Sequence, residues 1–465
     1  MSVTEYRRSR RLEADSRWGW GLLGGVCAAG VGAAAGHSAL LGAGVLAFLV
    51  VSYVVVRCPY VGVVALVGLT PIVSGMQRGL VVPDLRPSEA LIVWLAPLVI
   101  FAARRSVPKW GALEWLGLAY AGGTLFLGSF DLWRRGAPFD RSNIDGLLGP
   151  FQYLLLVRAV RVGAAGERAW RRLTAILILA AVPVSVFALL QGFGIEWAQH
   201  LSITLTGVNP GHPGRATGPF TNWQVLAGYL LAIGLLNAAV LAFEARRILT
   251  PRTAAAVLVL IGAALARTLT IGAFAGWAIG AAALAVWAGR VRLSGSRSAG
   301  AAGAAVVALA LVLAARFQQQ FHAAVGQAST GIIPRTLVSR YDIWTQQYFP
   351  ALSGRWVAGF GPDIPANVTW KYTDSVYVTM VLRGGLILLA LYAALMIGFV
   401  AVARRAATTT AEARAAVAAV CVLVIALAPL QLIATYFTTS GLPEALWIMA
   451  GLASLLPFAQ QRAHT

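Results

Sequence analysis

Residues 222–243 read NWQVLAGYLLAIGLLNAAVLAF, a run of 22 positions without a charged side chain. An α-helix needs about 20 predominantly apolar residues to cross the hydrocarbon core of a bilayer. Similar runs recur along the chain, which is 58% hydrophobic and 12% charged, with a mean hydropathy of +0.74. A soluble domain carries roughly twice that share of charge, and disorder requires low hydrophobicity. The sequence therefore predicts a membrane protein that crosses the bilayer many times.

The apolar runs predict an all-α, polytopic transmembrane bundle of about 12–14 spans. No stretch shows the alternation of apolar and polar residues that is typical of a transmembrane β-strand. The runs that predict spans are 19–36, 38–56, 59–76, 88–103, 111–128, 146–160, 173–192, 222–243, 253–267, 270–289, 298–316, 373–402, 414–436 and 441–459.

The positive charges of the chain indicate how it is oriented. Lys and Arg number 37 against 17 Asp and Glu, a net charge of +20, but they are spread between apolar runs. We interpret them as topology signals beside anionic lipid and expect no nucleic-acid partner. With a cytoplasmic N-terminus, 24 of the 37 fall on the inner side, in the termini and in short connections. This bias predicts that both termini are cytoplasmic.

The predicted topology gives one membrane domain with an elaborate outer face. A basic tail of residues 1–18 precedes a transmembrane region of residues 19–316, with outer loops at 129–145 and 193–221. A large outer loop of residues 317–372 leads to C-terminal transmembrane helices at 373–459 and a cytoplasmic tail at 460–465. Long loops of this kind commonly carry function. Functional residues are therefore expected on the outer face.

Two arginines on the outer side are candidates for binding an anion. Arg215 lies in the Gly- and Pro-rich stretch GHPGRATGPFTNWQVLAGYLL, where Thr221 or Asn222 is expected to cap the following helix. A basic residue beside a helix N-terminus is suited to hold a phosphate. The alternative is a polar loop that returns the chain to the membrane. Arg267, between two apolar runs, is either an interfacial anchor or a further wall of the same site.

The stretch SRYDIWTQQYFPALSGRWVAGFGPD at 339–363 predicts a helix lying on the membrane surface. Arg340, Trp344 and Tyr348 recur in it at helical spacing. Arg340 is expected to point toward a lipid headgroup, and the GFG sequence at 359–361 to allow a sharp bend. The alternative is an interfacial helix without chemistry. Arg355 in the same stretch is not required for topology.

The stretch KYTDSVYVTMVLRGG at 371–385 marks the point where the long loop enters a span. Asp374 either caps that helix or serves as a general base at the membrane surface, with Asp342 as the second candidate base. Arg383 lies two to three turns into the span. A charge there is costly, so we expect it to face a cavity or an acidic partner.

Three of these stretches resemble the O-antigen ligase and O-antigen polymerase family of bacterial membrane glycosyltransferases. RATGPFTNWQVLAGYL is similar to the family's arginine stretch that leads to an Asn and a span, and RYDIWTQQYFPAL…VAGFGPD to its Arg–x–x–x–Trp helix and Gly–x–Gly turn. YTDSVYVTMVLRGGLI is similar to the start of its next span. Family ligases usually carry a His–Asn pair where this chain has Asp374–Ser375, which favours a polymerase.

The resemblance implies sugar transfer on the outer face of a bacterial inner membrane. The donor would be a glycan on undecaprenyl diphosphate and the acceptor a second glycan or a lipid, with other polysaccharide-assembly membrane proteins as further partners. Displacement of the diphosphate would need cationic donors and a proton acceptor, and we expect neither metal nor cofactor. We assign Arg215 and Arg340 to the diphosphate and Asp374 to the proton. The expected substrate-binding residues are Arg267, Asp342, Asn222, Trp344 and Arg355.

Two other functions remain open at this point. The first is a ligase that transfers a finished glycan to a lipid or protein acceptor. The second is a flippase or transporter of lipid-linked sugars. Transporters usually place charges and broken helices near the bilayer midplane, often in duplicated halves. Most of the unexplained charges of this chain lie on one outer face, which favours an enzyme.

Overall fold

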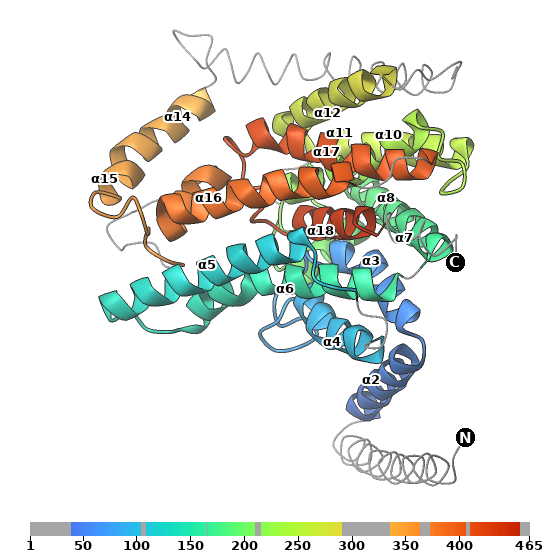
Figure 1. Ribbon diagram of the computed structural model, residues 1–465, viewed down its shortest axis with the longest axis horizontal. Helices are drawn as coiled ribbons and strands as arrows, with labels where there is room; N and C mark the ends of the chain where they lie inside the picture. The colour runs from blue at the N-terminus through green and yellow to red at the C-terminus, as the bar shows by residue number, and fades with distance from the viewer. Residues whose placement is uncertain are drawn as a thin grey trace.

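The computed structural model of the protein describes residues 39–103, 108–164, 166–209, 215–290, 335–362, 373–405 and 410–455. Throughout these ranges the regular elements are helices, and the longest of them lie side by side (Figure 1). The all-α class predicted from the sequence is confirmed. The helices are α2 (Ala39–Arg57), α3 (Pro59–Val73), α4 (Pro87–Ala102), α5 (Ala112–Arg135), α6 (Arg141–Gly163), α7 (Glu167–Leu179), α8 (Ala181–Gly192), α9 (Glu196–Thr206), α10 (Trp223–Ala242), α11 (Pro251–Thr268), α12 (Ile271–Arg290), α14 (Arg335–Ile343), the π-helix η2 (Trp344–Tyr348), α15 (Phe349–Ala351), α16 (Val376–Arg405), α17 (Ala411–Leu430) and α18 (Leu442–Ala453).

Fewer helices are suited to cross a membrane than the sequence predicted. Among the described residues six helices are long and apolar enough, or up to seven if the bent pair α2 and α3 forms one span. Those two helices meet at 117°, and α4 and α18 are shorter apolar helices. Helices α5 and α6 contain buried charged side chains such as Glu114 and Arg158. The expected spans 19–36 and 298–316 lie outside the described residues.

Helix α10 lies at the centre of the bundle. Almost all of its side chains are buried, because α11, α12, α17 and α18 pack around it. Its N-cap is Asn222, whose Oδ1 accepts a hydrogen bond from the Val225 backbone N–H at 2.9 Å. The expected cap at residue 221 or 222 is therefore confirmed as Asn222. The helix begins where the Arg215 stretch ends, so the cap fixes that stretch against the core.

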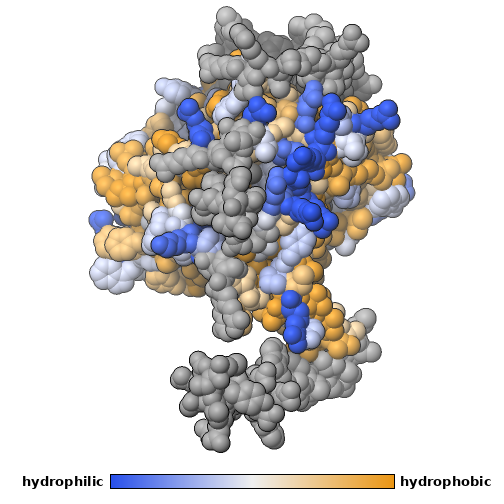
Figure 2. Space-filling view, turned by 45° about the vertical axis from the view of Figure 1, so that its right-hand side comes forward, coloured by the Kyte–Doolittle hydropathy of each residue, from blue (hydrophilic) through white to orange (hydrophobic). Residues whose placement is uncertain are grey.

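The two ends of the bundle differ in charge. At one end, which we call the site end, Ser375 before α16 contacts Gln431 after α17. At the opposite end, which we call the arginine-rich end, Glu114 near the start of α5 contacts Arg158 near the end of α6. Figure 2, with the right-hand side of Figure 1 brought forward, shows hydrophilic side chains gathered on one area and hydrophobic ones beside it. Described arginines in or beside the connections at the arginine-rich end are Arg168, Arg171, Arg172, Arg246, Arg247, Arg252, Arg404 and Arg414.

Helix α16 is broken at two glycines. Gly384 (φ −148°, ψ 19°) and Gly385 (φ 63°, ψ −160°) leave the helical conformation. The rings of Tyr377 and Tyr392 lie 6.2 Å apart, whereas 15 residues of continuous helix would separate their Cα atoms by about 22 Å. Residues 376–383 therefore fold back along the turns that follow the break. We call residues 373–383 the folded-back segment.

The GFG turn at 359–361 fills the break in α16. The backbone N–H of Phe360 donates to the Leu382 carbonyl at 2.7 Å, and that of Gly361 donates to the Arg383 carbonyl at 2.9 Å. A Cβ at Gly359 would lie 2.6 Å from the Leu382 carbonyl oxygen, so only glycine fits there. A broken helix within a bilayer needs such partners for its freed backbone groups. The bend expected from the sequence is present, with φ of 68° and 72° at the two glycines.

Candidate functional site

Arg340 of α14 and Asp374 of the folded-back segment form an ion pair at the site end. The Arg340 Nε lies 3.2 Å from the Asp374 Oδ2, and the two side chains are 21% and 34% exposed. One turn after Arg340, Trp344 donates its Nε1–H to the Thr373 carbonyl at 2.8 Å. These two contacts join α14 to the folded-back segment. The carboxylate of Asp374 thus remains open to solvent on one side while an arginine orients it.

Asp374 does not cap α16 with its side chain. The Val378 backbone N–H donates to the Ser375 Oγ at 3.4 Å, so Ser375 occupies the capping position. The Ser375 hydroxyl in turn donates to the Gln431 carbonyl at 3.1 Å. Asp374 has a φ of 50°, in the left-handed region that residues other than glycine seldom adopt. This conformation directs the carboxylate away from the helix and toward Arg340.

The π-helix η2 follows α14 directly, and Trp344 at its start contacts the residue before Asp374. π-Helices are rare and occur frequently at functional sites. Tyr348 at its end is fully buried near Asp374, and burial together with that negative charge raises the pKa of Tyr348 to about 12. Its hydroxyl is therefore protonated at neutral pH. Arg340, Trp344 and Tyr348 share one face of this helical stretch, as their spacing predicted.

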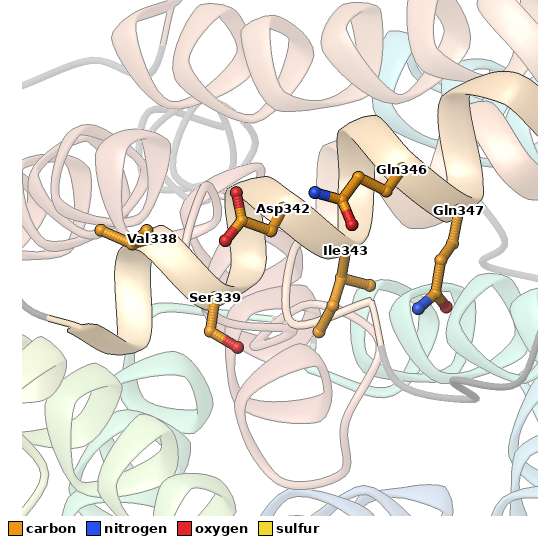
Figure 3. Close-up of a pocket in the computed structure, with 6 residues that line it drawn as sticks. All are labelled: Val338, Ser339, Asp342, Ile343, Gln346 and Gln347. Carbon is orange, nitrogen blue, oxygen red and sulfur yellow. The ribbon is translucent and has the colours of Figure 1, made fainter.

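Asp342 lies on a different face of α14 from Arg340. It is one of six residues that line a hollow of about 330 Å³ along α14 and η2. Figure 3 labels Asp342 together with the other five. No contact of the Asp342 side chain with Asp374 or Arg340 occurs among the described residues. The second candidate base is thus not brought to the ion pair. The residues that line the hollow are Val338, Ser339, Asp342, Ile343, Gln346 and Gln347.

Arg215 is held at the site end by a strained turn between α11 and α12. Its Nη2 donates to the Leu269 carbonyl at 2.8 Å, and its guanidinium carbon lies 4.5 Å from the centre of the Trp223 ring. Leu269 has a φ of 52°, which is costly for a bulky side chain. The Ala216 backbone N–H donates to the Arg267 carbonyl at 2.9 Å. The backbone segments that carry Arg215 and Arg267 therefore lie side by side.

A buried amide holds the loop that carries Arg215. The Gln191 Oε1 accepts the backbone N–H groups of Thr217 and Gly218, each at 2.8 Å. Ser202 donates its hydroxyl to the Gly218 carbonyl at 2.9 Å. Sequence reasoning missed Gln191. In the sequence, Gln191 is a single amide at the end of the apolar run 173–192. A polar side chain in such a run is costly unless it has hydrogen-bond partners.

Arg215 and Arg267 have no carboxylate partner within the described ranges. Both are partly buried, and Arg267 lies 4.3 Å from the centre of the Phe193 ring. Burial lowers the pKa of the Arg215 guanidinium, which still carries its charge at neutral pH. Two partly buried cations on neighbouring segments, without a carboxylate partner in the described ranges, are suited to an oxyanion ligand. We call these two residues the arginine pair.

Arg355 lies in an ion-pair network instead. Asp131 of α5 is buried and accepts the Arg355 Nη1–H at 2.7 Å and the Arg135 Nε–H at 2.6 Å. Arg135 also donates to the Phe360 carbonyl at 2.7 Å. The network holds the GFG turn in the break of α16. The ion pair with Asp131 is a structural contact of Arg355, whereas the sequence predicted a substrate-binding residue.

The arginine pair and the Arg340–Asp374 pair lie at the same end of the bundle. Residues 431–441 lie between them, because Gln431 contacts Ser375 and Tyr436 packs against Gly272 at the start of α12. No side-chain hydrogen bond of Arg215 or Arg340 reaches from one pair to the other across the described chain. The structure thus places two separate charged groups on one face. One is cationic and the other contains a carboxylate.

The described residues contain no group of three His, Cys, Asp or Glu side chains that could hold a metal ion. In comparison with known proteins, the sequence matches no protein-family model and no curated protein. A function for this chain therefore has to be argued from the geometry of the site end.

Proposed function

We propose that this protein is an integral membrane glycosyltransferase that extends a glycan carried on undecaprenyl diphosphate. The observation that carries the proposal is the arginine pair, two partly buried cations without an internal counter-charge, at the same end of the bundle as the Arg340–Asp374 pair. A transfer from a diphosphate-linked donor needs both a cationic site and a proton acceptor. The resemblance to the O-antigen ligase and polymerase family supports the same reaction.

The arginine pair would bind the diphosphate of the donor. The acceptor hydroxyl oxygen attacks the anomeric carbon, and the bond from that carbon to the diphosphate oxygen breaks. The electron pair of that bond stays on the diphosphate, whose growing negative charge Arg215 and Arg267 stabilise. One such donor is commonly worth about 3–4 kcal/mol in the transition state. The partly buried environment strengthens this effect, because fewer water molecules screen the charges.

Asp374 would accept the proton of the acceptor hydroxyl. Its carboxylate is one-third exposed and is held in place by Arg340. A positioned general base typically contributes about 10²–10⁴-fold to the rate. Arg340 is then a positioning residue that orients Asp374. The arginine pair, and not Arg340, binds the diphosphate. A single displacement of this kind inverts the configuration at the sugar carbon.

The distribution of arginines supports an orientation with the arginine-rich end toward the cytoplasm. The site end would then face outward from a bacterial inner membrane. Lipid-linked glycans that have crossed the membrane present their diphosphate at that surface. In this orientation the donor approaches from the bilayer and the acceptor glycan from the aqueous side.

The direct test is product size. Purified protein in lipid nanodiscs is mixed with an undecaprenyl-diphosphate oligosaccharide, and the products are separated on a gel. A ladder of lengths is expected for the wild type and none for Asp374→Asn or Arg215→Gln, while Arg246→Gln, at an exposed ion pair, keeps the ladder. Normal ladders from the first two variants would overturn the residue assignment. A single transfer product would instead make the protein a ligase.

A transporter of lipid-linked sugars is the second candidate. It is favoured by the break in α16 and the 117° bend between α2 and α3, because transporters commonly use broken helices. The same nanodisc sample discriminates the two. A transporter gives no new product, and in sealed vesicles it moves a fluorescent lipid-linked sugar between leaflets.

A further inference from the structure

Each guanidinium of the arginine pair lies over an aromatic ring. The Arg215 guanidinium carbon is 4.5 Å from the centre of the Trp223 ring. That of Arg267 is 4.3 Å from the centre of the Phe193 ring. A guanidinium that stacks on a ring leaves N–H groups at its edge, where a phosphate can accept them. Trp223 is partly buried, whereas Phe193 is 65% exposed, so an accessible apolar surface begins directly beside Arg267.

The end of α8 fixes the Phe193 ring relative to the cation. A Cβ at Gly192, the last residue of α8, would lie 3.0 Å from the Arg267 Cβ and Cγ, so the stem of Arg267 rests on this glycine. The next residue is Phe193, whose backbone N–H donates to the Leu189 carbonyl at 2.9 Å. The ring and the stem of the arginine are therefore held by two consecutive residues.

Helix α9 continues the apolar surface. Trp197 is 56% exposed and Leu201 is 40% exposed, and their spacing of four residues places them on one flank of the helix. The Trp197 ring lies 6.4 Å from the Phe187 ring of α8. The other flank carries the exposed polar side chains of Glu196 and His200. A helix with one apolar and one polar flank is suited to lie at the surface of a membrane.

Helix α9 is also fixed to the loop that carries Arg215. Ser202 on its buried side donates its hydroxyl to the Gly218 carbonyl at 2.9 Å. The segment from Phe193 to Ser202 is thus attached to Arg267 at one end and to the Arg215 loop at the other. The two cations and the apolar surface are therefore held together by contacts within the protein.

This combination selects the chemistry of the ligand. The cations are suited to an oxyanion, while burial of apolar carbon against exposed rings is favourable for an apolar chain. The segment Glu167–Gly192, which contains α8, is long and apolar enough to cross a membrane, and Val186 near its end is 42% exposed. A chain that leaves the bilayer along α8 therefore reaches Arg267 by way of Phe193. The ligand that fits both parts is an anion attached to a lipid chain.

We propose that Phe193, Trp197 and Leu201 bind the prenyl chain of the donor, at the isoprene units nearest the diphosphate. This inference rests on the proposed function, in which the arginine pair binds the diphosphate itself. Phe193 is then a specificity-determining residue, because it contacts both the chain and Arg267. The surface makes the site selective for lipid-linked diphosphates over soluble ones.

Titration calorimetry of the purified protein in nanodiscs tests this with two probes, farnesyl diphosphate and inorganic diphosphate. We expect Phe193→Ser to lower the affinity for farnesyl diphosphate about tenfold and to leave that for inorganic diphosphate nearly unchanged. Arg267→Gln should weaken the binding of both probes. Phe126→Ser is the matched control, because Phe126 is a 71% exposed ring on α5, and it should change neither affinity.

Two further variants separate the chain contact from a structural role of the ring. Phe193→Leu keeps an apolar side chain without the ring and should retain most of the affinity for farnesyl diphosphate. Trp197→Ser should lower that affinity several-fold, and it serves if Phe193→Ser does not fold. Equal losses of both probes in Phe193→Ser would show that the ring only holds Arg267, which would overturn the inference.

The outcomes also distinguish this inference from the proposed function. If wild-type protein binds both probes and the affinity for farnesyl diphosphate does not change in Phe193→Ser or Trp197→Ser, the chain surface is refuted and the diphosphate site stands. If neither probe binds to the wild type, the result counts against the proposed function itself.

Discussion

Two pairs of arginines, one at each end of this protein, differ in whether a carboxylate faces them. At the arginine-rich end, Arg158 and Arg161 both pair with Glu114, whose side chain is 0% exposed, and Arg158 does so at 2.8 Å. At the site end, Arg215 and Arg267 are partly buried without a carboxylate within the described ranges. The first arrangement satisfies its charges internally. The second leaves a positive charge that an anionic ligand can neutralise.

The difference teaches which cations serve folding and which are free for chemistry. A buried ion pair that loses one partner leaves a costly charge behind. At Glu114 the buried charges are paired, so this cost does not arise. Arg215 is partly desolvated without such a partner, and it lies next to Leu269, whose backbone is strained. Strain and uncompensated charge at one place are typical of functional sites. A substitution at one end should therefore leave the function of the other end intact.

Removing the carboxylate at the arginine-rich end should have the largest effect. Glu114→Gln leaves two buried guanidinium groups unpaired, and we expect it to lower the free energy of unfolding by about 3–5 kcal/mol. Thermal unfolding in detergent measures this. Glu167→Gln removes the partner of Arg171 but is 48% exposed, so it should change stability by less than about 1 kcal/mol. Equal effects of the two variants would remove the contrast between buried and exposed pairs.

Removing a cation at the site end should affect the reaction and spare the fold. Arg267→Gln takes away a donor to the diphosphate, and we expect the initial rate of chain extension to fall about 10²–10³-fold. The melting temperature should stay close to that of the wild type, because no carboxylate partner is lost. Arg246→Gln is the control, since Arg246 pairs with Glu244 in an exposed position. A normal rate with Arg267→Gln would refute its role.

The break in α16 can be tested by adding one carbon atom. In Gly385→Ala the new Cβ would collide with the backbone of Val357, and the residue would keep a φ of 63°. We expect a loss of about 1–3 kcal/mol in stability. Gly122→Ala is the matched control, because nothing lies within 4 Å of its Cβ position. That change should be neutral or stabilising, and a similar loss in both would show that the backbone at Val357 does not pack against the break.

The smallest expected effect concerns the contact between α14 and the folded-back segment. Trp344→Phe removes the hydrogen bond to the Thr373 carbonyl and should cost about 0.5–1.5 kcal/mol. We expect a rate reduction of several-fold without a change in substrate affinity, since Asp374 is displaced and the arginine pair is not. Trp133→Phe, at a 73% exposed ring, is the control. A change in affinity instead would place Trp344 in the binding site.

Local patterns in the sequence were sufficient for several of these features. The all-α class follows from long apolar runs, the cap at Asn222 from a polar residue before such a run, and the GFG bend from two glycines. The helical spacing of Arg340, Trp344 and Tyr348 also predicted one shared face. Each of these depends on residues close together in the chain.

Features that depend on distant residues were not predictable in this way. Asp131 and Arg355 are 224 positions apart, and nothing in either neighbourhood indicates their ion pair. The break at Gly384–Gly385 lies in an apolar run that continues on both sides, so hydropathy reported one span. Among the described residues six or seven helices pass as spans by length and hydropathy, because several of the predicted apolar runs form short or bent helices. The lengths and bends of these helices depend on contacts that hydropathy does not report.

Arginine labelling tests the central contrast most directly. Phenylglyoxal, which modifies accessible guanidinium groups, is applied to the purified protein with farnesyl diphosphate or with farnesol, and the adducts are located by mass spectrometry. We predict that Arg215 and Arg267 are labelled, that farnesyl diphosphate but not farnesol protects them, and that Arg158 and Arg161 remain unlabelled throughout. Labelling of Arg215 and Arg267 that is indifferent to farnesyl diphosphate would contradict an anion site at this end of the protein.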